Sequence, residues 1–305
     1  QGALDANTTG SSNTAVGVNA LGVNTTASNN TAVGATSLDA NTTGTQNNAF
    51  GVNALTANTE GNYNCAYGAN ALATITTAGS NTAFGANTLA ANTGAGNTAI
   101  GAFALDANTS AANNIAIGTN ALGAITTAPS TIGIGNSAGA AMVTGSGENV
   151  IIGNNAASAA TTFQQTVAIG DNAIGSGVAT GNENVVIGDN AGLALTSGGN
   201  NVLIGSANHD NLTTGNNNVS IGQNTAPSGV GVSGEILIGV ATTGAGANTA
   251  RFGLSSGAAT ISLDGSDTSW AAASDSRLKK DVANSTAGLS FINDLRPITF
   301  KWNLK

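Results

Sequence analysis

A hydrophobic residue followed by glycine recurs about every seventeen residues, from Val16-Gly17 to Ile238-Gly239. The interval strays from seventeen by at most one residue. So regular a period is typical of stacked structural units and not of one globular core. The glycines that mark the repeat are Gly17, Gly34, Gly51, Gly68, Gly85, Gly101, Gly118, Gly135, Gly153, Gly170, Gly188, Gly205, Gly222 and Gly239.

The composition agrees with a repeat array. Only 7% of the residues are charged and 4% are aromatic, whereas ordinary globular domains are about 25% charged. Disordered tracts share such low complexity, but they have no physical reason to hold Val, Ile and Phe in a fixed register. The sequence therefore predicts an ordered, repetitive fold.

Basic residues are confined to the end of the chain. Residues 1–250 contain no Lys or Arg, and Arg251 is the first base. A weakly acidic surface cannot neutralise phosphates, so we expect no nucleic-acid partner. The missing bases fit either compositional drift or selection for protease resistance, since trypsin finds no Lys or Arg there. No run of eighteen apolar residues occurs, so we expect no membrane insertion.

Residues that could carry substrate chemistry are sparse in the repeats. Cys65 is the only cysteine and His209 the only histidine. We interpret Cys65 as a small buried residue and His209 as a surface residue of a turn. Scattered acids such as Asp106, Asp171 and Asp189 form no paired carboxylates, and the nonapeptide period of calcium-binding repeats is absent. We therefore expect no metal and no cofactor.

A single repeat, residues 81–97, shows the expected coil. Thr82 and Phe84 alternate with Ala83, which is strand periodicity. Gly85 follows, where the backbone needs a positive φ or passes close to a neighbour. A second short strand would hold Leu89, and an Asn-Thr-Gly turn would end the coil. The predicted fold is all-β, a β-solenoid or β-roll with coils of about seventeen residues.

Stacking such coils aligns equivalent positions into columns. We expect the residue before each marked glycine to form an inner column, with the preceding Ala facing outward. A second inner column would consist of Leu21, Leu38, Leu55, Leu72, Leu89, Leu105 and Leu122. A third would hold asparagines that hydrogen-bond from coil to coil: Asn13, Asn30, Asn47, Asn64, Asn81, Asn97, Asn114, Asn149, Asn184, Asn201 and Asn218.

The small coil predicts self-association. About three to five large apolar side chains per coil are too few for a wide core in one chain, so three chains around one axis would bury the rest in a parallel homotrimeric fibre. From about residue 131 to 240 both strand faces become apolar, as in Asn149-Val-Ile-Ile-Gly153. We expect tighter association or a different packing there.

The Asn-Thr-Ala-Val-Gly-x-Asn-Ala-Leu pattern resembles the repeats of phage tail fibres. It is also similar to the head repeats of trimeric autotransporter adhesins, which fold as a left-handed parallel β-roll. These repeats cover about four-fifths of the chain. The resemblance implies a fibre fold and leaves the biological role open.

The segment from Ser274-Asp-Ser-Arg-Leu-Lys-Lys-Asp281 to Trp302 resembles the start of the peptidase S74 intramolecular chaperone domain, which trimerises a fibre or spike and then cuts itself off. The resemblance implies that Ser274 is the nucleophile, Lys279 its base, and Ala273–Ser274 the scissile bond. A competing interpretation is a helix start capped by Ser274 or Asp275. The family domain is longer than this segment. Gln1 opens the chain in mid-repeat, so we also expect an upstream part.

We therefore expect three segments: a repeat shaft at 1–253, a capping strand and linker at 254–273, and the truncated start of the chaperone domain at 274–305, which we expect to begin as a short α-helix. Within the linker, Ala259–Leu263 reads as a strand, and Trp270 could close the open end of the roll.

The function we expect is the shaft of a phage tail fibre or tailspike in the virion, with a host receptor of glycan or protein, and self-cleavage as its only catalysis. The alternative is a bacterial trimeric adhesin. An ice-binding solenoid is disfavoured because a flat Thr-x-Thr face is lacking.

Overall fold

The computed structural model describes residues 2–144, 147–263 and 271–272, and these contain strands and turns but no helix. The all-β prediction is confirmed. The strands are β1 (Thr14–Val16), β2 (Thr31–Val33), β3 (Asn48–Phe50), β4 (Cys65–Tyr67), β5 (Thr82–Phe84), β6 (Thr98–Ile100), β7 (Ile115–Ile117), β8 (Ile132–Ile134), β9 (Val150–Ile152), β10 (Val167–Ile169), β11 (Val185–Ile187), β12 (Val202–Ile204), β13 (Val219–Ile221), β14 (Ile236–Val240), β15 (Thr249–Leu254), β16 (Gly257–Ser262) and β17 (Ala271–Ala272).

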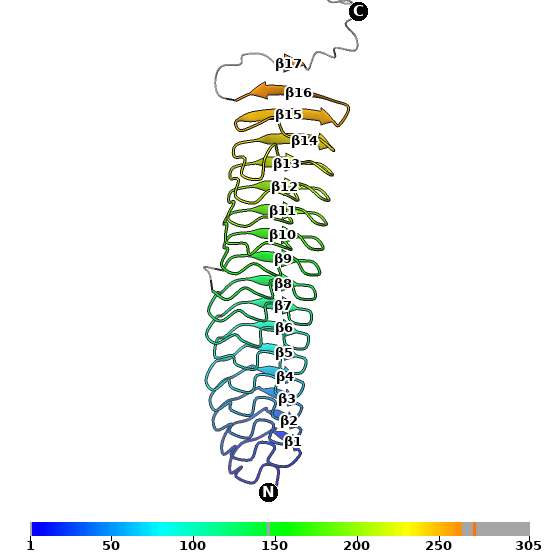
Figure 1. Ribbon diagram of the computed structural model, residues 1–305. Helices are drawn as coiled ribbons and strands as arrows, with labels where there is room; N and C mark the ends of the chain where they lie inside the picture. Colours follow the sequence, from blue (N-terminus) through cyan, green and yellow to red (C-terminus); the bar gives the residue numbers. More distant parts are fainter. Residues whose placement is uncertain (1, 145–146, 264–270, 273–305) are drawn as a thin grey trace, which may run out of the picture. The chain divides into compact units, whose positions relative to one another are not determined.

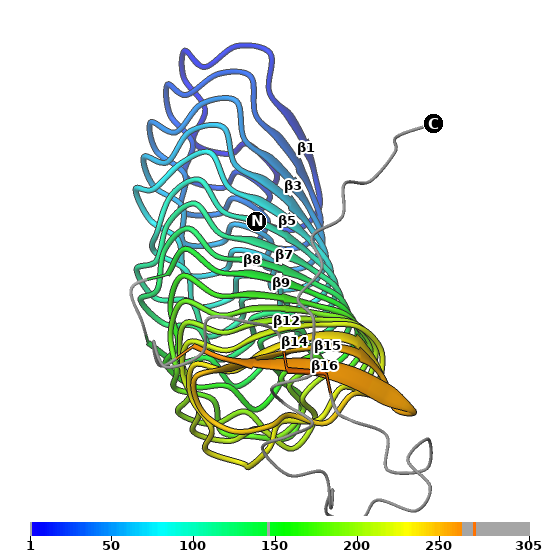
Figure 2. The same ribbon diagram turned by 90° about the horizontal axis from the view of Figure 1, so that it is seen from above.

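The repeats of residues 2–263 stack as coils of a parallel β-solenoid (Figure 1). Each strand from β1 to β14 pairs in parallel with the next, and equivalent residues lie opposite each other, as Val16 does with Val33. Seen from above, the strands gather on one side of the coils and the bends lie on the other (Figure 2). The last described pairing differs, because β16 runs antiparallel to β15. This hairpin contains most of the strand expected at Ala259–Leu263.

Each regular coil carries one strand of three residues, and the second predicted strand is a series of turns. Leu55, in that series, has a φ of 53°, and Leu89 has a φ of 51°. This left-handed conformation is costly for a branched side chain and excludes a strand. It aims the leucines inward, and all seven are fully buried as predicted. The alternation of polar and apolar residues over so short a segment could not distinguish a strand from a series of turns.

The marked glycines meet both conditions that the sequence suggested. Gly51 has a φ of 138°, and a Cβ there would lie 2.5 Å from the carbonyl oxygen of Gly68 in the next coil. No L side chain fits such a close approach of two backbones. Glycine is therefore required where the strand turns out of the sheet.

The predicted facing of the strands is wrong. The middle residue of the three-residue strands points inward: Ala83 and Ala116 are fully buried, whereas Phe84 is 55% exposed and Val16 is 58% exposed. The interior already contains the leucine column, so the strand side can contribute only a small residue in most coils. The residue before the marked glycine therefore forms an outer column, not an inner one.

In some coils the side-chain sizes on the two sides of the interior are reciprocal. Early coils pair a strand Ala with Leu. In the β11 coil the strand residue is Val186, and the position of the leucine column is Gly192. A Cβ on Gly192 would lie 3.2 Å from Leu203 Cδ1 and 3.3 Å from Val186 Cγ1. Close packing at constant volume explains why the larger Val186 faces a glycine in this coil.

The asparagine column before the strands is confirmed as a hydrogen-bonded ladder. Asn30 Oδ1 accepts the backbone N–H of Asn47 at 2.9 Å, and Asn30 Nδ2 donates to the carbonyl oxygen of Gly44 at 2.9 Å. Both bonds reach the following coil. Asn47 repeats the pattern with Asn64 and Gly61. Most of these buried amides thus fasten two coils and avoid the cost of about 1–3 kcal/mol for an unsatisfied buried group. Asn114 is an exception, because its Nδ2 has no hydrogen-bond partner among the described residues.

A second asparagine ladder, which the sequence analysis missed, runs through the turns. Asn41 Nδ2 donates to Asn24 Oδ1 at 3.0 Å, and Asn58 Nδ2 donates to Asn41 Oδ1 at 2.9 Å. Ile75 takes the next position, one coil after Asn58, and Asn58 Oδ1 has no partner among the described residues. The ladder is thus interrupted wherever an apolar side chain replaces the amide.

The predicted surface position of His209 is also wrong. His209 stands four residues after Gly205, in the leucine column, and is fully buried. Neither ring nitrogen has a hydrogen-bond partner among the described residues. Burial lowers the pKa of His209 to about 4, although the negative charges of Glu235 and Asp210 oppose the shift. His209 is therefore a neutral core residue at neutral pH.

The exchange of Val186 for Asp tests the corrected facing. A carboxylate at this fully buried position should lower the free energy of unfolding by about 4 kcal/mol or more. Guanidinium unfolding followed by circular dichroism measures the change. The control is Ser197→Asp, an exposed site that should change stability by less than about 0.5 kcal/mol. Equal midpoints for the two variants would contradict the inward assignment.

The buried His209 predicts a loss of stability in acid. The pKa of His209 in the folded chain, about 4, lies below the ordinary histidine value of 6.5, so the unfolded chain binds the proton more readily between these values. The contribution is therefore complete above about pH 6.5 and is lost as pH falls to about 4, by roughly 3 kcal/mol. Thermal midpoints from pH 7 to 4 should show this loss, and His209→Leu should flatten the profile in that window. A Leu variant with an unchanged profile would refute the assignment.

Candidate functional site

The described candidate site is a surface rather than a catalytic cluster. Ser274, Lys279 and the bond before Ser274 lie outside the described residues, as does Trp270. Within residues 2–144 and 147–263, no group of three or more His, Cys, Asp or Glu side chains could hold a metal ion. A search of the described residues also finds no helix with the length and hydrophobicity to cross a membrane.

The outward face of the strands carries a continuous apolar column. Its members are the third residues of β1 to β13 and the equivalent residue of β14, and each lies opposite the next in register. All are exposed or half-buried. We call this column the outer stripe; it comprises Val16, Val33, Phe50, Tyr67, Phe84, Ile100, Ile117, Ile134, Ile152, Ile169, Ile187, Ile204, Ile221 and Ile238.

A second outward column lies beside the outer stripe, at the first residue of each strand, and it changes chemistry at Ile115. Before that point its members are Thr14, Thr31, Asn48, Cys65, Thr82 and Thr98. From there to Ile236 all are Ile or Val. The apolar face is therefore one column wide in the early coils and two columns wide from β7 to β14.

Cys65 belongs to the polar part of this second column. It is partly buried, not enclosed in the core as the sequence suggested. Asn48 Nδ2 lies 3.8 Å from Cys65 Sγ. Cys65 is the first residue of β4, and the next residue, Ala66, occupies the core position of that strand.

Three consecutive members of the outer stripe are aromatic and stack on one another. The ring centroids of Phe50 and Tyr67 are 4.6 Å apart with planes 8° from parallel, and those of Tyr67 and Phe84 are 5.3 Å apart at 25°. Tyr67 is 36% exposed, and Phe84 is more exposed still. The stack thus presents ring edges to solvent along β3 to β5.

Charge is absent from both outward columns. Every acidic residue among the described coils lies outside the strands, as Asp39, Asp171 and Asp210 do. No lysine or arginine precedes Arg251. The outward face of β1 to β14 is therefore uncharged, while the bends carry the negative charge.

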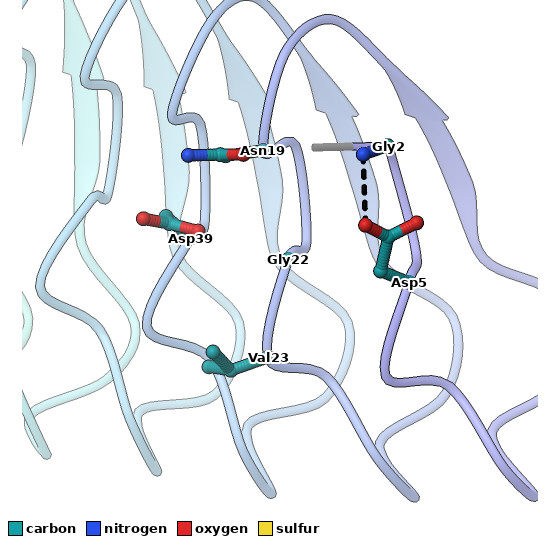
Figure 3. A pocket seen from close by; sticks show the side chains of 6 residues that line it. All are labelled: Gly2, Asp5, Asn19, Gly22, Val23 and Asp39. Carbon is teal, nitrogen blue, oxygen red and sulfur yellow. Dashed lines mark hydrogen bonds between the residues drawn. The ribbon is translucent and has the colours of Figure 1, made fainter.

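A small depression at the first coils is polar and open. It has a volume of about 200 Å³ and brings Asp5, Asn19 and Asp39 to one side of the coils around Gly22 (Figure 3). Asp5 accepts the N–H of Gly2 at 2.8 Å. Asp5 and Asp39 are the two carboxylates among the described residues that line it, and these lining residues include no histidine, lysine or arginine.

Comparison with known proteins gives one finding. Residues 274–305 match the Peptidase S74 family model, which describes the chaperone of endosialidase. Searches of curated proteins and of solved structures returned no match. The chain thus joins a β-solenoid to a C-terminal segment that matches this chaperone family.

Proposed function

We propose that the chain is the shaft of a homotrimeric phage tail fibre or tailspike, which acts in host attachment in the virion. The observation that carries the proposal is the outer stripe, an uncharged apolar column along the whole described solenoid. The chaperone-family match at residues 274–305 supports it, because that family resemblance implies a fibre or spike that assembles as a trimer. Host receptors would be bound elsewhere on the fibre or along its bends.

The extent of the outer stripe suits a lasting interface. Fully burying one Val or Ile contributes about 1.5–3 kcal/mol at about 25 cal/mol per Å². Partial exposure in every coil therefore leaves several hundred square ångströms for a partner, of the order of the roughly 800 Å² that each side of a specific interface buries. Soluble monomers rarely leave so long an apolar patch open.

The spacing of the outer stripe favours another copy of this chain as the partner. Consecutive members are separated by one inter-strand distance, about 4.8 Å. A partner that matches every step must present side chains with the same spacing, and parallel copies do so automatically. Closed cyclic symmetry then buries all stripes around one axis. The two-column face from Ile115 onward would form the strongest part of this interface.

The alternative role, a bacterial trimeric adhesin, rests on the likeness of the repeats to adhesin heads. It uses the same outer stripe and the same trimer. A complete gene with a membrane-anchor segment would favour the adhesin, whereas a virion-attachment segment would favour the fibre.

Maturation by self-cleavage completes the proposal. The Ser274 hydroxyl would attack the carbonyl carbon of Ala273, with Lys279 accepting the hydroxyl proton. The C–N bond between Ala273 and Ser274 would then break, with Lys279 returning the proton to the departing Ser274 nitrogen. Water would hydrolyse the resulting ester between the Ala273 carbonyl and Ser274 Oγ, which separates the two parts of the chain. The shaft would then end at Ala273 and be freed from its chaperone.

Ile187→Asp tests the interface. Three carboxylates would meet at the trimer axis, so the association constant should fall by about tenfold or more. Light scattering should report monomers, while the circular dichroism of the coils is retained because Ile187 faces outward. The control Ser197→Asp adds the same charge on a bend of the same coil and should remain trimeric. A native chain that is a stable soluble monomer would refute the trimer.

Ser274→Ala tests the cleavage in protein expressed from the complete gene. Intact-mass spectrometry should find wild-type shafts ending at Ala273, and the full precursor in Ser274→Ala and Lys279→Ala. Ser276→Ala, two residues further along the same motif, should still be cut. A wild-type precursor that never shortens would defeat the maturation step and leave the trimer untouched.

A further inference from the structure

We propose that the aromatic triplet of the outer stripe, formed by Phe50, Tyr67 and Phe84, fixes the axial register between copies of this chain. The inference rests on the proposed function, since it assigns a role within the same interface. The partner is a second copy, and the feature recognised is its own triplet at the same height.

The rest of the outer stripe cannot fix a register by itself. From Ile100 to Ile238 every member is Ile, and successive members lie one coil apart. A copy displaced by one coil would still place Ile against Ile along this run. Columns of identical side chains are prone to such slippage, because only the ends of the stack lose contacts.

The triplet breaks this translational symmetry. Its rings follow Val33 and precede Ile100 in one unbroken register. A displaced copy would set a ring against a β-branched side chain on one side and leave a gap on the other. Mismatches of volume at a packed surface are penalised in both directions, so the aligned arrangement is favoured.

Packing in the interior of a single chain does not explain why aromatic residues occupy these positions. The strand residues that face the interior beside them are Ala49, Ala66 and Ala83, all fully buried. The rings point the other way and touch one another, with centroids 4.6 and 5.3 Å apart. Ring stacking within one chain is therefore the competing explanation, and the experiment must separate the two.

The separating variant moves the triplet by three coils without changing composition. It carries Phe50→Ile, Tyr67→Ile, Phe84→Ile, Ile100→Phe, Ile117→Tyr and Ile134→Phe. Stacking within the chain is kept, since the new positions are again neighbours in register. Alignment with a native chain is lost, and a three-coil displacement would be needed to restore it.

The test is co-expression of native and moved-triplet chains with tags of different mass, followed by native mass spectrometry. Chance mixing gives about three mixed trimers for each unmixed one. If the triplet sets the register, mixed trimers should fall about tenfold or more below that share. The control chain carries Ile169→Val, Ile187→Val and Ile204→Val, which keep the column uniform, and should mix by chance.

Chance mixing of the moved-triplet chain would overturn the inference and leave the proposed trimer standing. A native chain that forms no assembly would instead defeat the proposed function itself. If the moved-triplet chain does not assemble alone, the double exchange Phe84→Ile with Ile100→Phe replaces it, and the same two outcomes decide.

Discussion

In-register hydrogen bonding between successive coils is the constraint on which the rest of the structure depends. The backbone of each strand forms hydrogen bonds with the preceding coil and with the following coil. The backbone of the bends does the same; for example, Leu55 N–H donates to the carbonyl oxygen of Ala71. Such pairing holds only if every coil follows the same path. Identical paths place equivalent side chains in columns, so one unfavourable position would be repeated along the whole stack.

That requirement explains which features could be predicted from sequence. Every coil needs glycine at the marked position, and most coils carry asparagine before the strand, while the early coils carry leucine in the turn. Their period is therefore visible, and the burial of the leucines and the hydrogen bonding of the asparagines were correctly predicted. The facing of the strand was not visible. Thr-Ala-Val alternates equally well with either face inward, and only the leucine opposite, which leaves room for Ala83 but not for Phe84, decides between them.

The burial of His209 is a second feature that the local sequence did not predict. Its neighbours Asn208 and Asp210 read locally as a turn, and the turn is real. Its place four residues after Gly205, where earlier coils hold leucine, was the better signal. Column position predicts burial more reliably than local polarity in a solenoid, because the path is shared. The proposed nucleophile Ser274 has no such column, since it follows the repeats, and its assignment depends on the family match alone.

A perfectly periodic chain would be stable yet would not define its own neighbours, because every coil would fit every other. The positions that depart from the repeat therefore determine which coils can lie next to each other. The switch to Ile115 and its successors widens the apolar face toward the end that matches a chaperone family. Glu235 ends the asparagine ladder, where its carboxylate accepts the N–H groups of Ser228 and Gly246 in place of another amide. The aromatic triplet belongs to the same class, since it adds little to one coil but distinguishes one height of the stripe from all others.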